Sequence, residues 1–204
     1  MRFDRKHWKA YRNSDHERLC NRFNIGLTHA FGAQPDPLTD EAQMVGLFLL
    51  LDKSYSAGLR RTVRNWDKYG SPMYRIASKI YGDKRRQQSF LMLAGRRGKL
   101  LSRANLRTVI ERVDALTDLL SQVNGSGRLP ISFSSKFLHF RTGIVPIWDT
   151  LARRGLQRLV GGRYSNYADY ATTVFNLLSD AYEKNSFEPQ EIKRLDNYLM
   201  WWGD

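Results

Sequence analysis

The chain has 204 residues, of which 33 are lysine or arginine and 20 are aspartate or glutamate, so its net charge is +13. A hydrophobic fraction of 42% is ordinary for a globular domain, and the length is sufficient for one real core. The charge favours a polyanionic partner, with nucleic acid ahead of an anionic membrane surface.

Membrane spans, disulfides and metal sites are disfavoured. The longest apolar run, residues 44–51, is far shorter than the ~20 residues of a transmembrane helix, and the N-terminus lacks the apolar core of a signal peptide. Cys20 is the single cysteine, and the four histidines are scattered without a zinc-binding spacing. We therefore expect a cytoplasmic, monomeric, single domain over residues 1–204, with no metal and no cofactor.

The first half of the chain predicts two helices joined by a loop. Apolar residues at helical spacing predict a helix over 9–23, followed by a loop rich in turn formers over 32–37. Thr39 is the expected cap of a long, deeply buried helix over 39–65. That helix ends in a basic stretch with Arg60, Arg61 and Arg64, which is either a phosphate-contacting surface or a solvated stripe.

Two dense basic clusters follow a short predicted helix over 73–81. The first contains Lys84, Arg85 and Arg86. The second contains Arg96 and Arg97 between two glycines, followed by Lys99. A glycine-flanked basic stretch is typical of a loop. Ser102 then caps a strongly amphipathic helix over 103–123, which ends at the Asn-Gly-Ser-Gly sequence of 124–127.

Residues 132–150 are the most informative stretch of the sequence. A helix that opens on a cluster of serines carries Lys136, and a turn through Gly143 and Pro146 leads to Asp149, at the start of the next helix. An amine and a carboxylate therefore lie near the starts of consecutive helices. Further helices are predicted over 165–185 and from 188 to the C-terminus, and no strand pattern is evident. The predicted fold class is all-α.

The order helix, turn, lysine-bearing helix, then Pro-Ile-Trp-Asp-Thr at 146–150 resembles the helix-hairpin-helix superfamily of DNA glycosylases, and in particular the 8-oxoguanine glycosylases. The resemblance covers residues 103–160. It implies a helical glycosylase fold that binds double-stranded DNA and excises a base. It also implies that Asp149 takes the place of the catalytic aspartate and Lys136 that of the amine nucleophile of bifunctional members.

The chemistry of these two residue types agrees with that role. Cleavage of an N-glycosidic bond builds positive charge on the sugar, and a nearby carboxylate stabilises that charge and can activate water. A lysine with a depressed pKa could instead attack the sugar carbon and form a Schiff base. The alternative is structural: Asp149 caps its helix, and Lys136 is a surface cation.

The remaining site residues are hypotheses about base and backbone contacts. Trp148, His139, Phe133 and Tyr55 are candidates for lining a pocket that receives an extruded base. Besides the basic clusters named above, Ser134, Ser135 and Arg141 are candidates for DNA contacts. The excised base is expected to be an oxidised purine, or a hypermodified phage base in a role in antiviral defence. The alternative function is a basic helical protein that binds DNA or RNA without chemistry.

Overall fold

The computed structural model describes residues 4–33, 36–55, 72–95, 98–125 and 130–204, and within them the protein is mostly helical. The described helices are α1 (Arg5–Arg12), α2 (Asp15–Phe31), η1 (Pro37–Thr39, a 3₁₀ turn), α3 (Glu41–Tyr55), α5 (Pro72–Tyr81), α6 (Lys84–Ala94), α7 (Arg103–Asn124), α8 (Ile131–Thr142), α9 (Thr150–Val160), α10 (Tyr167–Tyr182) and α11 (Pro189–Gly203). None of them is long and apolar enough to cross a membrane.

One small antiparallel pair of strands departs from the all-α prediction. β1 (Leu101–Ser102) pairs with β2 (Ser186–Phe187), with Leu101 opposite Phe187. The two-residue strands are too short to give an alternating pattern in the sequence. The pair joins the residues before α7 to the residues before α11.

The helix caps explain where the N-terminal boundaries differ from expectation. The predicted helix over 9–23 is two helices, because the Ser14 side chain accepts the Glu17 N–H at 3.2 Å and starts α2 there. Thr39 does not cap α3. It ends the 3₁₀ turn, and Asp40 accepts the Gln43 N–H at 2.8 Å instead. The part of the predicted helix beyond Tyr55 lies outside the described residues.

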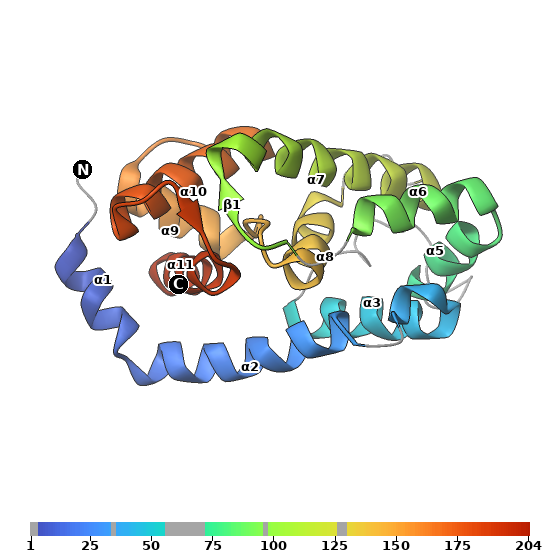
Figure 1. Ribbon diagram of the computed structural model, residues 1–204, viewed down its shortest axis with the longest axis horizontal. Helices are drawn as coiled ribbons and strands as arrows, with labels where there is room; N and C mark the ends of the chain where they lie inside the picture. The colour runs from blue at the N-terminus through green and yellow to red at the C-terminus, as the bar shows by residue number, and fades with distance from the viewer. Residues whose placement is uncertain (1–3, 34–35, 56–71, 96–97, 126–129) are drawn as a thin grey trace.

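α8 is the central helix of the protein, where the sequence had favoured α3. In Figure 1 it lies between α7 on one side and α2 and α3 on the other, and it contacts all three and α6. Residues 133–140 are all buried. Phe133 and Phe137 pack against Phe48 of α3, with ring centres 5.0 and 5.7 Å apart. Burial on every side makes α8 a rigid support for the polar side chains that it carries.

α9 and α11 cross in unusually close contact, and glycine makes this possible. A Cβ atom on Gly155 would lie 1.9 Å from the backbone oxygen of Leu199, and a Cβ atom on Gly203 would lie 1.9 Å from that of Leu151. The two backbones therefore touch directly at two points. This contact sets the position of α9, and with it the position of Asp149 at its start.

We expect Gly155→Ala to destabilise the fold by about 1–3 kcal/mol, because the added methyl group must push the two helix backbones apart. Gly26→Ala is the matched control: Gly26 lies inside α2 with no atom within 4 Å of the added Cβ, so helix propensity should raise stability by up to about 1 kcal/mol. Urea unfolding of both variants measures the difference. Equal stability of the two variants would contradict the close contact.

Candidate active site

Lys136 and Asp149 form an ion pair between α8 and the start of α9. The Lys136 Nζ lies 2.6 Å from Asp149 Oδ2, and the lysine side chain is fully buried while that of Asp149 is 21% exposed. Asp149 Oδ1 accepts the Leu151 N–H at 2.8 Å, so the same carboxylate caps α9. Lys136 lies in the middle of α8 and is not the surface cation of the structural alternative. The carboxylate is the member of the pair that solvent can reach.

The segment that leads to Asp149 is irregular, and side chains fix its backbone at four consecutive residues. His139 Nδ1 donates to the Val145 oxygen at 2.7 Å, and Ser135 Oγ accepts the Trp148 N–H at 3.0 Å. From α10, Tyr167 donates to the Pro146 oxygen at 2.8 Å and Tyr170 to the Ile147 oxygen at 2.7 Å. One backbone group of each residue from 145 to 148 thus has a side-chain partner, and the position of Asp149 is determined by both α8 and α10.

These contacts bear on two sequence-based hypotheses. Ser135 is a buried bond acceptor for Trp148 and does not face a DNA phosphate. Trp148 is 8% exposed and packs between Tyr170, at 5.4 Å between ring centres, and the Arg153 guanidinium, 4.4 Å from its ring. Trp148 is therefore held in place and offers little surface for a base. Burial raises the pKa values of Tyr167 and Tyr170 well above the ordinary value, so both remain neutral donors.

A second carboxyl group lies close to the ion pair. Asp196 on α11 is buried, and its Oδ1 has no hydrogen-bond partner among the described residues. Burial, and then the charge of Asp149, raise the pKa of Asp196 well above its usual range, although Lys136 and Lys193 act in the opposite direction. Burial therefore favours the protonated, neutral form of Asp196 beside the Lys136–Asp149 pair.

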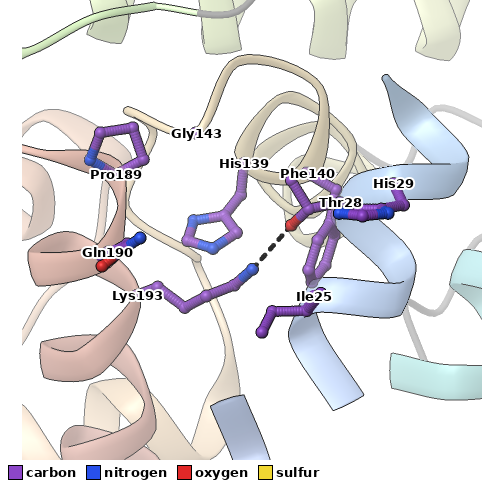
Figure 2. A pocket seen from close by; sticks show the side chains of 9 residues that line it. All are labelled: Ile25, Thr28, His29, His139, Phe140, Gly143, Pro189, Gln190 and Lys193. Carbon is purple, nitrogen blue, oxygen red and sulfur yellow. Dashed lines mark hydrogen bonds between the residues drawn. The ribbon is translucent and has the colours of Figure 1, made fainter. Parts of the chain in front are cut away.

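A cavity of about 260 Å³ lies between α2, α8 and α11 (Figure 2). Its volume is close to the lower end of the roughly 300–1,000 Å³ range of small-molecule sites. Phe140 and His139 line it from α8 and Lys193 from α11. The Lys193 ammonium donates to Thr28 Oγ1 at 2.8 Å and lies 5.1 Å from the Phe140 ring centre. Phe140 follows Lys136 by one helical turn, so the cavity and the ion pair are neighbours along α8.

His139 is a neutral hydrogen-bonding group in this cavity. Burial lowers its pKa to about 3, so the ring carries no charge near pH 7. A carbonyl oxygen can only accept, so the bond to Val145 places the proton on Nδ1 and leaves Nε2 as an acceptor. His139, which the sequence proposed as a base-pocket residue, therefore lines a cavity, and its ring is held in one tautomer.

The remaining base-pocket candidates are Phe133 and Tyr55, and of these two the structure describes the side chain of Phe133 alone. Phe133 is fully buried in the aromatic cluster with Phe48, and Tyr55 is the last residue of α3, with a side chain outside the described part of the chain. Phe133 lies close to Lys136 in the sequence, but sequence distance does not show which face of α8 packs into the core.

The proposed DNA contacts divide into three groups. Lys84, Arg85, Arg86 and Lys99 are exposed, the first three on the first turn of α6, a helix that the sequence did not predict. Ser134 is fully buried, and Arg141 donates to the oxygens of Phe31 and Gly95 and pairs with Asp36, so both are structural residues. The remaining candidates lie outside the described residues: Arg60, Arg61, Arg64, Arg96 and Arg97.

Sequence reasoning missed Lys193 and Asp196, because it assigned no role to the polar residues of the last helix. Lys193 and Asp196 are three residues apart, so they share one face of the helix. This spacing was the signal by which the sequence could have revealed them. Among the described residues, no three histidine, cysteine or acidic side chains lie close enough together to hold a metal ion.

Comparisons of this chain with protein-family models, with curated proteins and with solved structures find no match. The contacts, burial and charges of the site therefore carry the functional proposal.

Proposed function

We propose that this protein is a DNA glycosylase that extrudes a damaged or modified base from the duplex and excises it, leaving an abasic site. The observation that carries the proposal is the 2.6 Å contact between the fully buried Lys136 and the partly open Asp149, one helical turn from a cavity with an aromatic wall. The consecutive helices α7, α8 and α9 and the net charge of +13 support the same assignment.

In this proposal the Asp149 carboxylate lies against the sugar of the extruded nucleotide. As the glycosidic bond breaks, its electron pair leaves with the base, which takes up a proton, and the sugar becomes positively charged. The carboxylate stabilises this cation and accepts the proton of the water that attacks C1′. The hydrogen bond from Lys136 holds the carboxylate in one orientation. In the bifunctional alternative, Lys136 loses its proton and attacks C1′ itself.

The cavity lined by Phe140, His139 and Lys193 is the proposed place for the extruded base. Phe140 offers a ring for stacking, His139 Nε2 can accept from a base N–H, and the Lys193 ammonium favours an electron-rich base edge. An oxidised purine or a hypermodified pyrimidine of phage type would meet this pattern. The second of these would assign the protein to antiviral defence.

The test is an excision assay on duplexes that each carry one modified base, followed by alkali. We expect strand breaks at the modified position with at least one class, and release of the free base by mass spectrometry. Borohydride during the reaction should trap a covalent adduct only if Lys136 attacks, and Lys136→Gln should then abolish the adduct. Tight duplex binding without any base release would instead support the non-catalytic DNA- or RNA-binding alternative.

A further inference from the structure

A second cavity, of about 290 Å³, opens beside the start of α9 and is lined by arginines. Thr150, Arg153, Arg154 and Gln157 stand on successive turns of one face of the helix. The chain then reverses at Gly161 and Gly162, which have φ values of +81° and +86°, where an L side chain would be strained. This turn brings Arg163 and Tyr164 to the opposite wall of the cavity.

The three guanidinium groups gather here without a matching acid. No carboxylate lines the cavity, and among the described residues none of the three arginines takes part in an ion pair. Arg153 Nε is buried and has no hydrogen-bond partner among those residues, while its guanidinium is held against Trp148 at 4.4 Å. Like charges in one concave site repel each other, and an oxyanion that accepts from several of them relieves this repulsion.

We infer that this cavity binds a phosphate group of the DNA strand, next to the nucleotide on which Asp149 acts. Thr150 lines the cavity and directly follows Asp149, so a sugar held at the carboxylate places its flanking phosphate toward the arginines. Arginine forks match phosphate oxygens with paired hydrogen bonds. The position of the phosphate relative to Asp149 rests on the proposed function, whereas phosphate binding by the cavity does not.

The test compares duplex affinity across salt concentrations for the wild type, Arg154→Gln/Arg163→Gln and Arg107→Gln. Arg154 and Arg163 are exposed, so their replacement should leave the fold intact. Arg153→Gln tests the third arginine of the cavity in a separate variant. Arg107 is exposed and pairs with Glu111 on α7, so its variant controls for the loss of surface charge. Each lost phosphate contact should lower the slope of log affinity against log salt by about 0.9. Arg107→Gln should leave the slope unchanged.

A methylphosphonate scan locates the phosphate. Replacing the phosphate beside the modified nucleotide by a neutral group should weaken binding by the wild type but not by Arg154→Gln/Arg163→Gln. An unchanged salt slope in that variant and in Arg153→Gln would overturn the inference. Protection of the wild type from heat by inorganic phosphate, with the duplex slope unaffected by the variants, would also overturn it and assign the cavity to free phosphate. A reduced slope together with absent base excision would support the cavity and refute the glycosylase.

Discussion

Asp149→Asn should reduce the rate of base excision by about 100-fold or more while the protein still folds and binds duplex DNA. Asparagine is as good a helix cap as aspartate, so the bond from the Leu151 N–H can be kept. The amide carries no negative charge to stabilise the sugar cation or to take a proton from water. It also removes the Asp149 charge that lies 2.6 Å from the buried Lys136 ammonium. Single-turnover excision at saturating protein measures the chemical step.

Asp83→Asn is the matched control for this variant. Asp83 caps α6 through the N–H groups of Arg85 and Arg86, as Asp149 caps α9, but the cation paired with it, Arg86, is exposed. It should excise at the wild-type rate. Thermal unfolding of each variant sets an assay temperature at which all of them are folded. Wild-type excision by Asp149→Asn would show that the carboxylate is only a cap and an ion-pair partner.

Helix boundaries were predictable where the signal is local. Ser102 and Asn105 form a reciprocal capping box at α7, and Gly125, at φ +67°, ends that helix where the glycine-rich sequence predicted. The start of α9 at Asp149 and of α11 at Pro189 followed from the same kind of signal. α6 was missed because three consecutive cations were interpreted as a surface cluster and the cap at Asp83 was overlooked.

The pairing of Lys136 with Asp149 was predictable from their places on consecutive helices, but its environment was not. Whether a lysine in the middle of a helix is buried depends on which helices surround it, and α2, α3, α6 and α7 are distant in the sequence. The hydrogen bonds of Ser135 and His139 could not be predicted for the same reason. Their polar atoms bond to the backbone of residues 145 and 148, and only the folded turn brings that backbone within reach.

Removing Asp149 alone and removing Lys136 alone should lower the free energy of unfolding by clearly different amounts. Asp149→Ala leaves a fully buried ammonium without its carboxylate and removes the α9 cap, so we expect a loss of about 3–5 kcal/mol for the broken buried pair. The missing cap should add about 1 kcal/mol to this loss. Lys136→Met keeps the apolar stem and leaves Asp149, which is partly open to solvent and still accepts the Leu151 N–H. We expect Lys136→Met to lose clearly less free energy of unfolding than Asp149→Ala.

The double variant Lys136→Met/Asp149→Ala distinguishes burial of charge from loss of packing. If the ammonium that has lost the Asp149 carboxylate causes most of the damage in Asp149→Ala, then removing that ammonium should restore part of the stability. The double variant should then be more stable than Asp149→Ala alone. Urea unfolding with equal m values gives the three free energies. Additive losses would instead mean that the two side chains stabilise the protein independently. In that case the contact between Lys136 and Asp149 would contribute little to the stability of the fold.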